Sequence, residues 1–360
     1  MRVLVDASAL SDARRDAGIG RYVRAMLEAL GRQPGIEVVP VRPFTRPPVE
    51  SWPVRFINAQ PALTVAWIRR GRPLVHAMSS DPMLLCPPAR QVVTLHDVIP
   101  WAGPAQGMYL RMQRSRLRRA AAIIVPSTHV AGRAVDVLGL ERSRVHVVAE
   151  GVDPAFRPDA TDAEPAAAAI AAPGTYLLWV GSLVAHDPRK ALDVLLDATA
   201  GLEPRPAVVL AGARGAEADR VAARGRALGL DLRLPGWVAD SELAALYRGS
   251  LAAVFPSLDE GFGLPALEAL ACGALLVASA IEPVTAIAGD AALLATPGDV
   301  VSLRAALHVA MTLPPEARGM RREAGLRRAA TYTWAAAAAT VADLYRDVDA
   351  AYRDRARSAR

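Results

Sequence analysis

The sequence has 360 residues, a formal net charge of +6, 52% hydrophobic and 5% aromatic residues, and a mean hydropathy of +0.20. This length predicts two domains with sizeable cores, and the apolar content excludes a disordered or fibrous chain. Two cysteines, Cys86 and Cys272, are too few for a disulfide framework or a cysteine metal site. No apolar run reaches the ~18 residues of a membrane span, so we expect a soluble, cytoplasmic protein.

The positive charge comes almost entirely from arginine. Lys190 is the only lysine, so 41 of the 42 basic residues are arginines. Arginine, alanine and proline are all abundant, which indicates a compositional bias rather than an adaptation to bind an anion. Because zinc-finger spacing and aromatic-interleaved basic motifs are absent from the sequence, we expect no nucleic-acid partner.

Short apolar runs alternate with helical patterns in the first half, as is typical of parallel βα units. We expect strands at residues 3–5, 37–39, 74–77, 92–95, 122–125 and 145–148. Helices are predicted at residues 20–30, 62–69, 108–119 and 128–138.

The alternation restarts in the second half, with strands expected at 176–180, 207–210, 232–234, 252–255 and 275–278. The predicted domains are 1–160 and 175–333, joined by a proline-rich linker at 161–174. A C-terminal helix within 334–360 is expected to pack back on the N-terminal domain. The predicted fold is α/β, with two Rossmann-like doubly wound domains facing a central cleft, where parallel sheets bind ligands.

A glycine-rich turn follows the predicted strand at 252–255. Gly261 and Gly263 allow the backbone to approach a ligand closely, and Pro265 suits the first turn of a helix whose free N–H groups attract an anion. Glu260 precedes this helix and Glu268 lies one turn into it, so the two carboxylates suit the hydroxyl groups of a sugar. The alternative is an ordinary βα turn with an acid near the helix dipole.

The segment EGFGLPALEALACG resembles the E-x7-E motif of the retaining nucleotide-sugar glycosyltransferases of family 4, which have the GT-B fold. Further short matches follow in the same order along nearly the whole chain, at residues 18–22, 95–100, 151–153 and 188–190. The segments HDVIP and GIGRY are most similar to bacterial mannosyltransferases of group 1.

The resemblance implies that Lys190 binds the donor diphosphate, that Glu260 positions the hydroxyls of the donor sugar and that His96 closes the sugar pocket, and these three are the expected catalytic residues. Donor-binding roles are implied for Arg189, Gly181, Trp237, Val238, Phe262, Gly263, Leu264 and Glu268, the last holding the ribose.

Several of these residues also have a structural alternative. Gly18 and Gly20 form a phosphate or acceptor loop, or a plain helix start. Arg189 is otherwise a solvated charge, Trp237 a core-edge aromatic and His96 a buried structural histidine.

The expected activity is therefore transfer of a hexose, mannose first, from a nucleoside diphosphate sugar to a hydroxyl of a saccharide, lipid-linked or natural-product acceptor, with retention of configuration. The donor is GDP-mannose or a UDP-sugar, with no further cofactor and no metal. A sugar-nucleotide 2-epimerase and a non-catalytic sugar-nucleotide-binding protein are the alternatives. The basic segment Met108–Arg119 is a candidate for peripheral membrane contact, with a solvated helix face as the other interpretation.

Overall fold

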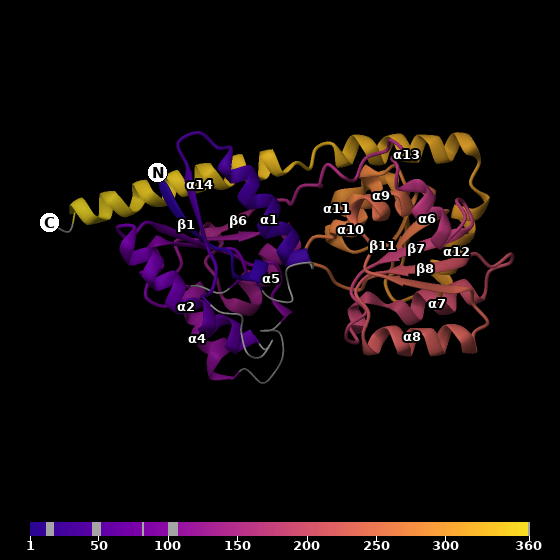
Figure 1. The fold of residues 1–360 in the computed structure, drawn as a ribbon, viewed down its shortest axis with the longest axis horizontal. Coiled ribbons are helices and arrows are strands. Elements are labelled where there is room, and N and C mark those ends of the chain that lie inside the picture. The colour runs from indigo at the N-terminus through magenta and orange to yellow at the C-terminus, as the bar shows by residue number, and fades with distance from the viewer. Residues whose placement is uncertain (12–17, 45–51, 81–82, 100–106, 359–360) are drawn as a thin grey trace. The chain divides into compact units, whose positions relative to one another are not determined.

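The computed structural model describes residues 1–11, 18–44, 52–80, 83–99 and 107–358, which form two compact units (Figure 1). The first unit comprises Met1–Gly151 together with Thr333–Arg360, and the second comprises Val152–Tyr332. The chain therefore leaves the first unit after residue 151 and returns to it at residue 333.

The first unit contains a six-stranded parallel sheet in the order β2-β1-β3-β4-β5-β6. Its strands are β1 (Arg2–Asp6), β2 (Glu37–Val41), β3 (Leu74–Ala77), β4 (Gln91–Thr94), β5 (Ala122–Val125) and β6 (Val145–Val147). Its helices are α1 (Gly18–Gly31), α2 (Trp52–Arg69), α4 (Met108–Leu117), α5 (Thr128–Leu138) and α14 (Trp334–Ser358), with 3-10 turns at Ser8–Ser11, Pro88–Arg90 and Arg142–Arg144.

Successive side chains of strand β1 supply different cores on the two faces of the sheet. Val3 and Val5 of β1 pack with α1 and α14 on one face of the sheet. Leu4, between them, packs with α2 on the other face. This alternation follows from the pleat of a strand, which sends successive side chains to opposite faces. Both faces are covered, as expected for a parallel sheet.

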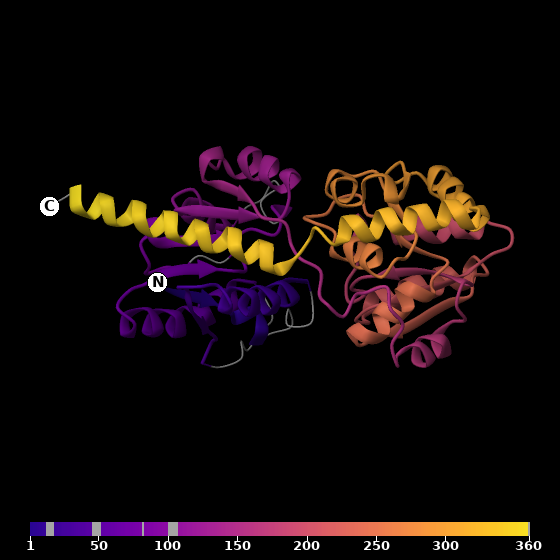
Figure 2. The same cartoon turned by 90° about the horizontal axis from the view of Figure 1, so that it is seen from above.

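Helix α14 covers the first unit although it is the last helix in the chain (Figure 2). The hydroxyl of Tyr345 and Nδ1 of His76 are hydrogen-bonded at 2.6 Å inside the core. Asp349 pairs with Arg90 at 3.4 Å, and the guanidinium of Arg90 lies 4.5 Å from the ring centroid of Tyr352. These contacts attach the C-terminal helix to a sheet formed by residues more than 200 positions earlier.

The second unit contains another six-stranded parallel sheet, in the order β12-β11-β10-β7-β8-β9. Its strands are β7 (Tyr176–Val180), β8 (Ala207–Ala211), β9 (Leu232–Gly236), β10 (Ala252–Phe255), β11 (Leu276–Ser279) and β12 (Leu293–Ala295). Its helices are α6 (Glu164–Ile170), α7 (Leu192–Ala200), α8 (Ala216–Ala227), α9 (Asp240–Gly249), α10 (Leu264–Ala271), α11 (Glu282–Ala288), α12 (Val300–Thr312) and α13 (Pro315–Ala329), with 3-10 turns at Pro188–Lys190 and Gly289–Ala291.

The two faces of this sheet are covered by different helices. Helices α7, α8 and α12 pack on one face, around buried residues such as Leu177, Leu195 and Leu307. Helices α9, α10 and α13 lie on the other side of the sheet (Figure 1). The layers confirm the doubly wound α/β architecture predicted from the sequence for each half.

Three elements differ most from the sequence-based expectations. The segment 161–174, expected to be a linker, carries helix α6 and belongs to the second unit, because the run Glu164–Ile170 is rich in alanine and its Glu164 bonds to Thr161 and Arg248. Helix α2 begins at Trp52 and continues through Pro61, whereas the predicted helix began after this proline, at residue 62. Strand β12 was not predicted, because it has only three residues, of which Ala295 alone is buried.

Candidate functional site

Helix α10 begins at a glycine in the left-handed region. Gly263 has φ 107°, a conformation disfavoured for residues with a side chain, and it turns the loop after β10 into the helix. Pro265 occupies the first turn, where a missing N–H costs nothing. The N–H groups of Ala266 and Leu267 donate to the carbonyl of Gly263 at 3.0 and 3.2 Å, so those of Gly263 and Leu264 are left at the positive end of the helix dipole. An anion at this helix start stays a prediction that the backbone geometry allows.

Lys190 and Glu260 form an ion pair in the second unit. Lys190 ends the 3-10 turn after β7, and Glu260 follows β10. Because β7 and β10 are neighbours in the sheet, the loops at their carboxyl ends meet. Nζ of Lys190 donates to Oε1 of Glu260 at 2.7 Å, and the two side chains are 26% and 12% exposed. Two residues that the sequence singled out separately are therefore in direct contact.

Residues 181–191, which we call the Lys190 loop, are held from two sides. The N–H of Gly181 donates to Ala211 O at 3.0 Å, and the N–H of Leu183 donates to Ala213 O at 2.8 Å. A Cβ on Gly212 would lie 1.8 Å from the carbonyl oxygen of Gly181, so this close approach requires glycine. On the other side, the N–H of Leu258 donates to the carbonyl of Arg189 at 2.7 Å.

Arg189 has a partner within the same loop. Its Nε and Nη2 atoms donate to the two carboxylate oxygens of Asp187 at 3.0 and 2.7 Å. Asp187 also accepts a hydrogen bond from the N–H of Arg189 at 3.1 Å. Both cations of the loop are thus paired, Arg189 with Asp187 and Lys190 with Glu260. Only the partner of Lys190 belongs to the loop that leads into α10.

Glu268 lies inside α10 and is 3% exposed. The hydroxyl of Tyr247 donates to its Oε2 atom at 3.2 Å. The ring of Tyr247 packs edge-on against Phe156, with the centroids 6.1 Å apart. The second carboxylate of the motif is therefore held in the protein interior, while Glu260 lies at the loop.

The remaining predicted donor-binding residues differ in exposure. Trp237 follows β9 and is 58% exposed, whereas Val238 is 9% exposed. Phe262 is buried, with its ring centroid 6.0 Å from that of Tyr332. Leu264 begins α10. Trp237 is therefore a surface side chain rather than a core-edge one, and Phe262 packs in the interior against Tyr332.

His96 follows β4 in the first unit, in a largely buried position. Its Nε2 atom lies 2.9 Å from the carbonyl oxygen of Met78, so this nitrogen carries the proton and donates. The ring packs edge-to-face against Tyr22, with the centroids 4.7 Å apart. Nδ1 lies 3.7 Å from Oε1 of Glu150.

Glu150 is a residue that the sequence reasoning missed. It follows β6 and is 5% exposed, and its Oε2 atom has no hydrogen-bond partner among the described residues. Its one sequence signal was its place directly before Gly151, in a segment noted for its resemblance. A Cβ on Gly151 would lie 2.2 Å from the backbone nitrogen of Trp334, so this segment is fixed where α14 begins. Imidazole and carboxylate together form a polar cluster at the carboxyl edge of the first sheet.

Gly18 and Gly20 lie in the first turn of α1, which begins two residues before the predicted start. Gly18 is exposed, and a Cβ there would meet no atom within 4 Å. Helix α4 carries the basic segment between 108 and 119, where Met108 is 81% exposed. Arg116 of this helix turns inward and donates to the carbonyls of Met83 and Cys86.

In the part of the chain that the structure describes, no three His, Cys, Asp or Glu side chains gather in a way that could hold a metal ion. None of the described helices combines the length and the hydropathy needed to cross a bilayer.

Comparisons with known proteins relate both halves of the chain to glycosyltransferases. Residues 17–156 match the family model described as "Glycosyltransferase Family 4", and residues 174–312 match the model "Glycosyl transferases group 1". The O-antigen chain mannosyltransferase B of Escherichia coli is 35% identical over 167 residues, which cover 44% of this chain and 42% of that protein. A D-inositol 3-phosphate glycosyltransferase of Kineococcus radiotolerans is 35% identical over 253 residues, which cover 63% of this chain and 57% of that protein.

The chain therefore spans about half the length of these curated relatives. Among solved structures, sucrose-phosphate synthase of Thermosynechococcus elongatus matches 98% of this chain and 100% of its own, with a TM-score of 0.79 and 22% identity. At this identity the likeness concerns the fold.

Proposed function

Since the chain belongs to the group 1 and family 4 glycosyltransferases and has their GT-B fold, we propose that it transfers a hexose from a nucleoside diphosphate sugar to an acceptor hydroxyl with retention of configuration. The observation that carries the proposal is the Lys190–Glu260 pair beside the start of α10. The ammonium and the free N–H groups at this helix start suit the diphosphate of a donor. The carboxylate suits the hydroxyls of its sugar.

The charge that develops during transfer explains this set of groups. When the bond from the sugar to the diphosphate breaks, negative charge grows on the leaving diphosphate and positive charge grows on the sugar ring. Lys190 and the N–H groups around Gly263 and Leu264 stabilise the leaving group because they are already oriented before the reaction. Glu260 accepts hydrogen bonds from sugar hydroxyls and orients the ring.

The nucleoside part of the donor has separate contacts in this proposal. Glu268, oriented by Tyr247, accepts hydrogen bonds from the ribose hydroxyls. Trp237 offers its exposed ring to the base, with Val238 beside it. His96, whose tautomer is fixed by its hydrogen bond to Met78 O, contacts the transferred sugar in this proposal.

For the substrates, we propose GDP-mannose as donor, with a UDP-sugar second, and no metal or further cofactor. Mannose is favoured because a relative 35% identical over 167 residues is named a mannosyltransferase. The acceptor is a saccharide, a lipid-linked oligosaccharide or a natural product bound by the first unit.

A chemical experiment tests the donor site directly. Because Lys190 is the only lysine, an amine-selective N-hydroxysuccinimide ester reports on this side chain and on the α-amine of Met1 as an internal control. We expect GDP or UDP to slow acylation of Lys190 and to leave Met1 unchanged, as measured by peptide mass spectrometry. Equal labelling of Lys190 with and without both nucleotides would refute a diphosphate site at this residue.

Transfer itself is tested with GDP-mannose and UDP-glucose, with and without an acceptor panel that includes methyl α-mannoside. We expect a glycosylated product, and loss of transfer by orders of magnitude in Glu260→Gln and Lys190→Ala. Glu316→Gln, an exposed carboxylate in α13, is the matched control and should retain activity. Conversion of the donor sugar without an acceptor would instead indicate an epimerase, and donor binding without turnover would indicate a binding protein.

We also propose a peripheral contact of α4 with anionic lipid. Exposed Met108 and Arg111 provide an apolar and a cationic group on this helix. Co-sedimentation with phosphatidylglycerol vesicles should be lost in Arg111→Glu. Absence of sedimentation with the phosphatidylglycerol vesicles would assign α4 a solvated face instead.

A further inference from the structure

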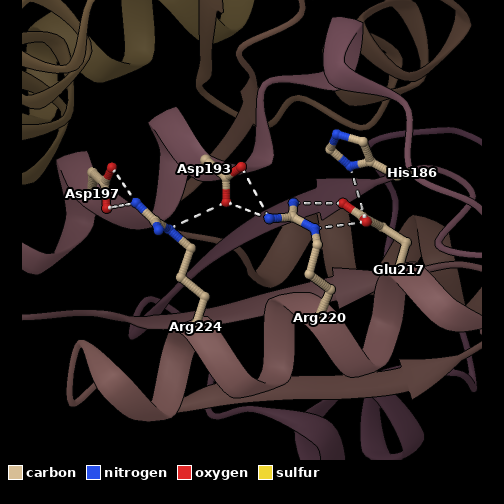
Figure 3. A network of polar contacts seen from close by, with 6 residues as sticks. All are labelled: His186, Asp193, Asp197, Glu217, Arg220 and Arg224. Carbon is tan, nitrogen blue, oxygen red and sulfur yellow. Dashed lines mark hydrogen bonds and ion pairs between the residues drawn. The ribbon is translucent and has the colours of Figure 1, made fainter.

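A chain of alternating charges joins α7, α8 and the Lys190 loop on the second unit (Figure 3). Nε and Nη2 of Arg220 donate to the two oxygens of Glu217 at 2.8 and 2.7 Å. Nη1 of Arg220 donates to both oxygens of Asp193 at 2.9 and 3.0 Å. Arg224 pairs with Asp193 at 3.2 Å and donates to both oxygens of Asp197 at 2.7 Å.

One contact of this network reaches outside the two helices. Nδ1 of His186, in the Lys190 loop, lies 3.1 Å from Oε2 of Glu217. The side chain of His186 is 53% exposed, whereas that of Glu217 is 3% exposed. Since a carboxylate only accepts, Nδ1 of His186 carries the proton and donates. The exposed loop is thus fastened to a buried group on α8.

A buried carboxylate needs partners, because burying an unpaired charge is costly. Arg220 supplies two hydrogen bonds and lowers the pKa of Glu217, partly against the opposing effect of burial. Arg220 alone therefore satisfies both oxygens of Glu217, and the helices would remain joined without His186. The hydrogen bond of His186 to Glu217 therefore restrains the Lys190 loop rather than the two helices.

The backbone hydrogen bonds that join this loop to other elements lie near its two ends. The N–H groups of Gly181 and Leu183 donate to Ala211 and Ala213, the carbonyl of Leu183 accepts from Ala218 of α8, and the carbonyl of Arg189 accepts from Leu258. His186 lies between these two anchors, four residues before Lys190.

We propose that Glu217 and Arg220 are positioning residues, which hold the Lys190 loop through His186 in the conformation that binds the donor diphosphate. This inference rests on the proposed function, because the diphosphate is the ligand assigned to Lys190. The opposite end of the network, Arg224 with Asp197, joins α7 to α8 and makes no hydrogen bond or ion pair with the described residues of the loop.

The test compares the affinities of GDP, UDP, guanosine and uridine by titration calorimetry. In His186→Ala we expect a loss of diphosphate affinity of about threefold to fivefold, the effect of one partly exposed charged contact, with nucleoside affinity unchanged. His186→Asn should restore the affinity, because its amide nitrogen takes the place of Nδ1. His308→Ala, an exposed histidine of α12, is the matched control.

The helix side of the tether is tested with a second matched pair. Glu217→Gln and Asp197→Asn each convert one network carboxylate to an amide, and we expect only the first to weaken diphosphate binding. Unchanged diphosphate affinity in both His186→Ala and Glu217→Gln would overturn the inference while leaving the proposed function intact. An equal loss in Asp197→Asn, or an equal loss of nucleoside affinity, would also overturn it. Wild-type protein that binds neither GDP nor UDP would overturn the proposed function itself, and the inference with it.

Discussion

The Lys190–Glu260 pair predicts that one substitution will change diphosphate binding and sugar transfer in opposite directions. In the structure, Glu260 accepts the hydrogen bond of the ammonium at 2.7 Å, so a bound diphosphate must share that ammonium with a carboxylate. Glu260→Gln removes the competing negative charge and keeps the size and an acceptor oxygen. We therefore expect the variant to bind GDP or UDP more tightly, and to transfer sugar far more slowly.

The magnitude follows from the exposure of the pair. With side chains 26% and 12% exposed, the pair lies between an exposed ion pair, at about 0.2–1 kcal/mol, and the cost of breaking a buried one, at about 3–5 kcal/mol. If the diphosphate recovers about 1 kcal/mol of that interaction in the variant, the affinity for GDP or UDP rises by about fivefold.

Calorimetric titration of the sugar-free nucleotides measures this effect without the contact between Glu260 and the sugar. The control is Glu316→Gln, which makes the same chemical change at an exposed site and should leave the affinity unchanged. Weaker or equal binding of GDP and UDP by Glu260→Gln would refute competition between the carboxylate and the diphosphate.

Burial lowers the pKa of His76 from its ordinary 6.5 to about 3. Between pH 6.5 and pH 3 the unfolded chain therefore binds a proton at His76 that the folded chain does not. The first unit should lose about 1.4 kcal/mol of stability per pH unit as the pH falls below about 6.5. Urea unfolding at pH 7.5 and 5.5 checks this, and an equal pH dependence in His76→Asn would contradict it. Gly212→Ala should cost about 2 kcal/mol of stability and disturb donor binding, because its Cβ would lie 1.8 Å from a backbone oxygen. The control is Gly31→Ala, whose Cβ would meet open space, and equal melting temperatures of the two variants would refute this steric argument. Trp237→Ala should weaken nucleotide binding by about tenfold, the scale of one base–aromatic stack. Unchanged affinity would show that Trp237 is a surface residue that does not contact the base.

The sequence determined the local structure of most of the chain. The apolar runs of the strands and the amphipathic patterns of the helices depend on neighbouring residues, so their positions follow from composition and period. The turn at Gly263 and the start of α10 were also predictable, because glycine and proline have specific backbone preferences. The spacing of Glu260 and Glu268 and the presence of a single lysine, Lys190, could also be read directly from the sequence.

The tertiary structure decided which of these residues meet. Lys190 and Glu260 are 70 positions apart and touch because β10 lies beside β7 in the sheet, an order that local patterns do not encode. The same holds for His186 with Glu217, whose contact depends on β8 lying on the other side of β7. Glu150 looked ordinary in the sequence, because its burial beside His96 arises only when β4 and β6 join one sheet. Local sequence sets the elements, whereas strand order, fixed by the packing of the whole unit, assembles the site.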